Sequence, residues 1–235
     1  MRVLAIETAT AEVGLAIADE AGIVAELRLR AGRRHAEVLN LGVTDLLDLS
    51  ATLLGDIAAL AVDIGPGLFT GIRVGVAAAK GFAMGLDKPI VALTSLQIIA
   101  SACATFGQQD ALGVVDLRRG EVAWQIPGSA PSHGPPEALI ESLANLETGG
   151  HRLFLAGDGA LRYATQLRNA LGKRVAIGGS DLAAPPVASL AVRAITEVAA
   201  GRAVDAAEVL PEYLRDADVR INWSTRHDSP RQADR

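Results

Sequence analysis

The chain has 235 residues, half of them apolar, and its 22 basic and 27 acidic side chains give a net charge of −5. This apolar fraction excludes a disordered chain, and one cysteine with four scattered histidines excludes a disulfide scaffold and argues against a Cys/His zinc site. No apolar run approaches the roughly 18 residues of a membrane span, and the opening segment is unlike a secretory signal. The acidic balance also argues against a stand-alone nucleic-acid binder. We therefore expect a cytoplasmic protein without membrane contact.

The first half of the chain alternates strands and helices. Short apolar runs bounded by polar residues or glycine predict strands at 3–9, 12–18 and 23–29. A stripe of helical period predicts a helix over 33–49. A buried strand at 57–64, a helix at 70–86, a strand at 89–93 and a helix at 95–106 are expected next.

The second half repeats this style with shorter elements. We predict strands at 112–116, 121–126, 152–156, 174–177 and 210–214, and helices at 137–146, 161–171 and 187–200. The stretch PGSAPSHGPP at 127–136 is typical of a linker. We predict lobes at 1–109 and 110–221, the second with a short last strand, and a loose tail at 222–235. Two such halves indicate a duplicated α/β fold, with mixed sheets flanked by helices.

The sharpest local motif is GPGLFTGIRVG at 65–75, which follows a buried strand and opens a helix. A glycine turn at a helix start can present backbone N–H groups to a phosphate or carboxylate. The same glycines also suit a tight turn with close helix packing. The motif is neither a Walker A loop nor a dinucleotide fingerprint, so both interpretations stay open.

Two acids end the lead strands of the halves, Glu7 and Asp116. If these two acids faced one cleft, the arrangement would resemble the ATP-binding site of actin, hexokinase and Hsp70. However, Arg118 and Arg119 follow Asp116, where that class of proteins has small residues. No metal site, nucleophile–base pair or other catalytic residue is apparent, and no cofactor is expected. Weak anion or nucleotide binding stays an open alternative, and its predicted residues are Glu7, Thr8, Gly65, Gly67, Asp116, Gly157 and Gly159.

Five segments together resemble one family. They are, in order, MRVLAIETAT, RHAEVLNLGVTDLL, ALAVDIGPGLFTGIRVGVAAAKGFA, VVDLRRGEVAW and PEYLR. The chain resembles the TsaB (YeaZ) family, bacterial subunits of the machinery that makes threonylcarbamoyladenosine at position 37 of certain tRNAs. The resemblance is strong over 1–125 and 208–223, and holds mainly in layout between them.

The resemblance implies a two-lobed actin/Hsp70-like (ribonuclease H-like) fold without catalytic activity of its own. The chain would bind and activate TsaD, its catalytic paralogue, a TsaE-type ATPase would join, and tRNA would be handled through the complex. Free copies would form homodimers through the same surface. Ser95 and Ile99 stand where TsaD-like chains carry two metal-binding histidines, and neither side chain replaces imidazole well. An ATP-binding transferase or kinase of this fold is the alternative.

The helices at 33–49 and 70–86 are the predicted partner interface. Glycine costs up to about 1 kcal/mol relative to alanine inside a helix, so the many glycines of the second helix need a packing reason. Two such helix pairs would form a four-helix bundle between subunits. The alternative is that both helices merely cover their own sheet. The predicted interface residues are His35, Leu39, Val43, Leu46, Leu47, Thr70, Arg73, Val74, Ala77, Ala78 and Gly81.

Overall fold

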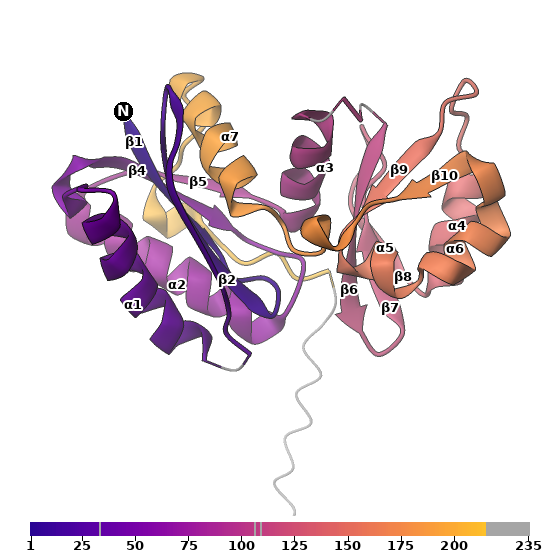
Figure 1. Cartoon of the computed structure of the whole chain (residues 1–235), viewed down its shortest axis with the longest axis horizontal. Helices are drawn as coiled ribbons and strands as arrows, with labels where there is room; N and C mark the ends of the chain where they lie inside the picture. Colours follow the sequence, from indigo (N-terminus) through magenta and orange to yellow (C-terminus); the bar gives the residue numbers. More distant parts are fainter. Residues whose placement is uncertain (33, 106, 109, 215–235) are drawn as a thin grey trace, which may run out of the picture.

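The computed structural model describes residues 1–32, 34–105, 107–108 and 110–214, so the predicted tail at 222–235 lies outside the described residues. The chain forms two lobes side by side, each built on one five-stranded sheet (Figure 1). Within the described residues, no helix is both long enough and apolar enough to cross a membrane.

The first sheet has the order β3-β2-β1-β4-β5. Its strands are β1 (Arg2–Glu7), β2 (Glu12–Asp19), β3 (Gly22–Arg30), β4 (Ile57–Asp63) and β5 (Ile90–Leu93). The helices α1 (His35–Leu49) and α2 (Phe69–Leu86) cover one face, and α7 (Val187–Ala199) covers the other (Figure 1). Because both faces are covered, β1 and β4 are apolar almost throughout.

The second sheet has the order β10-β9-β6-β7-β8. Its strands are β6 (Ala111–Arg118), β7 (Glu121–Trp124), β8 (Ser132–Gly134), β9 (Leu153–Ala156) and β10 (Val175–Ile177). One apolar core joins this sheet to α4 (Pro136–Ala144) and α6 (Ala164–Leu171), and another joins it to α3 (Ser95–Thr105). The remaining helices are α5 (Asp158–Arg162) and the 3₁₀ turns η1 (Leu54–Asp56), η2 (Gly172–Arg174), η3 (Ser180–Leu182) and η4 (Ala206–Glu208).

The two sheets share one internal topology. In each, the lead strand pairs antiparallel with the second strand and parallel with the fourth, and the outer strands continue those pairings. Counted within its own half, each sheet therefore has the order 3-2-1-4-5. This equivalence supports the predicted duplication more directly than any sequence repeat.

Three predicted elements were wrong. The stretch read as a linker contains β8, which pairs with β7 and completes the second sheet. The helix predicted at 161–171 is divided at Tyr163 into α5 and α6. The strand predicted at 210–214 is absent, and this segment instead runs beside α2 and the turn after β4 without regular secondary structure.

The strands of the first sheet come from residues before 109 and those of the second sheet from residues after it, but the helices cross between the lobes. α7, from the second half, packs on β1 and β2 through Val187, Leu190 and Ala191, and α3, from the first half, packs on β6. An amphipathic pattern shows that a helix covers a sheet but not which sheet it covers. The lobe boundaries thus describe the sheets rather than the helices.

Candidate functional site

The glycine turn after β4 is packed against the loop that follows β1. A Cβ on Gly71 would overlap the Thr8 carbonyl oxygen, and one on Gly75 would overlap Thr8 Oγ1. The Thr8 hydroxyl donates a hydrogen bond to the Gly71 carbonyl at 2.8 Å, and the Leu68 N–H donates to the Ala9 carbonyl at 2.7 Å. These contacts favour the packing interpretation of the motif over an anion site.

Gly65 and Gly67 serve the same packing. The space beside Gly67 is filled by the Ala9 carbonyl, and the space beside Gly65 is filled by the Glu212 carbonyl oxygen and Ile72. Gly65 also has a φ of 101°, which only glycine adopts at low cost. Close packing is therefore a sufficient reason for glycine at both positions.

Two buried carboxyls, Glu7 and Asp63, lie at the ends of the parallel strands β1 and β4. Glu7 Oε1 accepts the Ala9 N–H at 2.7 Å. Asp63 accepts the Gly65 N–H and the Ser95 hydroxyl, both at 2.8 Å. Burial raises the pKa of Asp63 to about 7, although these two hydrogen bonds oppose the change. Burial, together with the charge of Asp63, raises the pKa of Glu7 as well.

The Asp63 carboxyl makes stability depend on pH. A raised pKa means that the folded chain holds a proton that the unfolded chain releases, so the free energy of unfolding falls as pH rises from about 4 to about 7. We expect Asp63→Asn to flatten this fall and to leave the variant about 1 to 4 kcal/mol more stable than the parent above pH 7. Urea unfolding between pH 5 and pH 8 measures the free energy of unfolding of the variant and the parent at each pH.

The control for this prediction is Asp45→Asn on the exposed surface of α1, which should keep the parent profile. Glu7→Gln provides a second variant that removes the other buried carboxyl. Parallel pH profiles for Asp63→Asn and the parent would contradict the proposed linkage.

Asp116 is buried, and two arginines of its own chain pair with its carboxylate. Its Oδ2 accepts Arg118 Nη1 at 2.9 Å and Arg162 Nη1 at 2.8 Å, while the Asp116 N–H donates to Asp158 Oδ1 at 2.8 Å. Burial, with the charge of Asp116, raises the pKa of Asp158 to about 6. Asp116 and Glu7 therefore have separate partners among the described residues, the two arginines for Asp116 and the Ala9 N–H for Glu7.

The glycines expected near Asp116 are also packing residues. A Cβ on Gly157 would overlap the Val114 carbonyl oxygen, and a Cβ on Gly159 would lie 2.9 Å from the same oxygen. The nucleotide site predicted from these residues therefore stays a prediction that the contacts do not favour.

The two positions compared with metal-binding histidines have other roles here. Ser95 is buried with its hydroxyl on Asp63, and Ile99 lies in the core between α3 and the second sheet. Among the described residues, no group of three or more His, Cys, Asp or Glu side chains is arranged to hold a metal ion.

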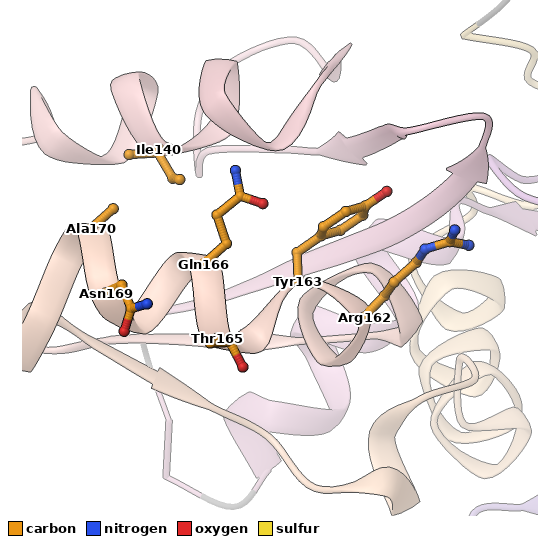
Figure 2. A pocket seen from close by; sticks show the side chains of 7 residues that line it. All are labelled: Ile140, Arg162, Tyr163, Thr165, Gln166, Asn169 and Ala170. Carbon is orange, nitrogen blue, oxygen red and sulfur yellow. The ribbon is translucent and has the colours of Figure 1, made fainter.

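A shallow cavity of about 670 Å³ lies between α4 and the start of α6. Figure 2 shows the Gln166 side chain reaching towards the helix that carries Ile140. The Arg162 side chain lies at the end of the cavity that is far from Ile140. Gln166 Nε2 donates to Glu137 at 2.6 Å, and Arg162 is engaged by Asp116. With both groups already partnered, the cavity is a poor candidate for the functional site.

The interface prediction was wrong for four residues of α1. His35, Leu39, Val43 and Leu46 are at most 5% exposed, because they face their own sheet. His35 Nε2 lies 2.8 Å from the Thr10 carbonyl, which fixes the loop after β1. Leu47, Val74 and Ala78 are half-buried against the same core. For these residues the structure favours the alternative, in which the helices cover their own sheet.

The exposed surface of α2 nevertheless forms one continuous stripe. We define the α2 stripe as Thr70, Arg73, Ala77, Gly81 and Met84, all exposed and spaced three or four residues apart. Met84 is 74% exposed, and on the neighbouring α1 Leu41 and Leu49 are 69% and 81% exposed. A Cβ on Gly81 or Gly85 would meet no atom within 4 Å. The fold itself thus gives no reason for glycine at these two positions.

One cluster beside the stripe was not anticipated from sequence. Tyr213, from the segment after η4, lies against Phe69, with ring centroids 4.8 Å apart, and its hydroxyl accepts Arg73 Nε at 2.9 Å. The i, i+4 spacing of Phe69 and Arg73 was visible, but the approach of a residue 140 positions away was not.

Comparison with known proteins identifies the relatives of this chain. Residues 8–128 match the family model TsaD, described as tRNA N6-adenosine threonylcarbamoyltransferase. The Escherichia coli tRNA threonylcarbamoyladenosine biosynthesis protein TsaB is 38% identical over 53% of this chain, and the match spans only 54% of that relative. The TsaB of Bacillus subtilis is 28% identical over 95% of this chain and 98% of its own length.

Solved structures agree with the sequence relatives. A Pseudomonas aeruginosa protein described as similar to peptidase YEAZ is 28% identical, with a TM-score of 0.79 over 91% of this chain and 99% of its own. YeaZ from the same organism is 26% identical, with a TM-score of 0.74 over 91% and 100% of the two chains. The expected two-lobed actin/Hsp70-like fold is confirmed. The TsaD family model covers more than half of this chain, and the chain's TsaB and YeaZ relatives match nearly all of its length. The chain therefore belongs to the TsaB (YeaZ) branch of the TsaD family.

Proposed function

We propose that this chain is an accessory subunit that binds and activates a TsaD-type threonylcarbamoyl transferase in forming threonylcarbamoyladenosine at position 37 of tRNA. The names of the TsaB relatives support the pathway. The α2 stripe, with the exposed leucines of α1 beside it, supplies the docking surface.

The observation that carries this proposal is the pair of unexplained glycines, Gly81 and Gly85. In an exposed helix each costs about 1 kcal/mol relative to alanine, and a Cβ added at either position would meet no atom of the described residues within 4 Å outside its own helix backbone. A partner helix that approaches α2 closely gives them a role, because glycine allows backbones to pack at short distance. Docking would also bury Met84 and the neighbouring leucines, which are otherwise exposed to water.

We propose that the chain performs no chemistry itself. Its buried acids are bonded within the protein, with Glu7 and Asp63 against backbone amides and Ser95, and Asp116 between two arginines. We propose that the chain needs no cofactor and that a TsaE-type ATPase is a further member of the assembly. In this proposal the partners mediate contact with tRNA, and the chain associates with itself when TsaD is absent. The proposed location is the cytoplasm.

Two measurements test this function. We expect the chain to copurify with a TsaD-type subunit as a stable complex, and to show no magnesium-dependent phosphate release from ATP on its own. Robust ATP hydrolysis by the isolated chain, lost in Glu7→Ala, would support the alternative transferase or kinase. Failure of the two subunits to associate would refute the docking role.

A further inference from the structure

Arg73 is held in an unusual setting at the start of α2. Its guanidinium carbon lies 3.6 Å from the centre of the Phe69 ring and 5.7 Å from that of Tyr213. Its Nε donates to the Tyr213 hydroxyl at 2.9 Å. A guanidinium stacked on one ring and bonded to another has lost most of its rotational freedom before any ligand arrives.

The segment that carries Tyr213 is itself fastened to the first lobe. Lys80 Nζ donates to the Val209 carbonyl at 2.9 Å, and the Glu212 N–H donates to the Ile64 carbonyl at 2.7 Å. Val209 is buried in the core of the first lobe. The ring of Tyr213 is thus a fixed support for Arg73 rather than a loose neighbour.

The two terminal nitrogens of Arg73, Nη1 and Nη2, have no hydrogen-bond acceptor among the described residues. Within the part of the chain that the structure describes, only Nε has a hydrogen-bond acceptor, and no carboxylate pairs with this arginine. By contrast, Arg118, Arg162 and Arg202 each pair with an acid of the chain. Arg73 is exposed on the α2 stripe, between Thr70 and Ala77.

We propose that Arg73, braced by Phe69 and Tyr213, is a preformed receptor for a carboxylate side chain on the partner helix that docks along the α2 stripe. This inference rests on the proposed docking function and names the chemistry of its contact. A helix seated on small residues at Ala77 and Gly81 passes beside Arg73. Two adjacent guanidinium nitrogens have the spacing to donate to both oxygens of an aspartate or glutamate carboxylate. The positive charge of Arg73 also favours an acidic residue of the partner.

The test is the dissociation constant of the complex with the TsaD-type subunit, measured from about 0.05 to about 0.5 M salt. We expect Arg73→Met, which keeps the stacking stem, to weaken binding by about 10- to 100-fold at low salt and to reduce the salt dependence. Arg73→Lys should recover only part of the affinity, because an ammonium lacks the planar fork. Tyr213→Phe, which keeps the ring but loses the hydroxyl, should cause a smaller loss of affinity.

Arg168→Met, at an exposed arginine of α6, is the matched control and should bind as the parent does. Equal affinity and equal salt dependence in Arg73→Met and the parent would overturn the receptor while leaving docking intact. A loss confined to tRNA binding, with subunit affinity unchanged, would assign Arg73 to phosphate and also overturn it. Absence of binding by the parent itself would overturn both the docking function and this inference.

Discussion

Gly71→Ala is expected to destabilise the fold by about 3 kcal/mol or more, while Gly81→Ala, the same change on the same helix, should stabilise it by up to about 1 kcal/mol. At Gly71 the new methyl group would overlap the backbone oxygen of Thr8, which cannot move without disturbing the end of β1. At Gly81 the methyl group meets open space, so only the better helix propensity of alanine acts.

Thermal unfolding measures both effects. For a chain of this size we expect the midpoint to fall by roughly 6–12 °C in Gly71→Ala and to rise by roughly 2–4 °C in Gly81→Ala. Gly85→Ala, which also meets open space, should behave like Gly81→Ala. Equal shifts at Gly71 and Gly81 would contradict the division of these glycines into packing and docking groups.

Ala77→Trp is expected to weaken binding to the TsaD-type subunit by about 100-fold, or roughly 3 kcal/mol, without unfolding the chain. Ala77 is exposed in the middle of the α2 stripe, so an indole there obstructs a docked helix without entering the core. Ala78 is a poorer choice because it is half-buried against the core of the first lobe. Calorimetric titration gives the affinity, and the unfolding midpoint shows whether the fold is intact.

Ala170→Trp is the matched control, since Ala170 is an exposed helical alanine in the second lobe. It should bind the partner as the parent does. If Ala77→Trp also binds with unchanged affinity, the α2 stripe is not the docking surface.

Local pattern was sufficient for most of the helices and strands and for the family. The buried strands and the helix after GPGLFTG were predicted within a few residues because their periodicity is strong. β8 was missed because three residues among prolines and glycines carry no strand pattern, and only pairing with β7 makes them a strand.

The errors at the site have a common physical origin. Leu39 and Ala77 both lie on helices predicted as the interface, but Leu39 belongs to the apolar stripe that faces its own sheet, whereas Ala77 lies on an exposed side. The Glu7–Asp63 pair depends on parallel pairing of strands that are distant in sequence, and the Arg73–Tyr213 contact depends on where the last segment returns. These contacts follow from tertiary structure and leave no local signal.

The most direct test of the proposed function is tRNA modification with purified components. The TsaD-type and TsaE-type subunits, the substrate threonylcarbamoyl donor and an unmodified tRNA are incubated with and without this chain, and threonylcarbamoyladenosine is quantified. We expect modification to require the chain, to survive Glu7→Gln, and to be lost with Ala77→Trp. Equal modification with and without the chain would contradict its role as an activating subunit.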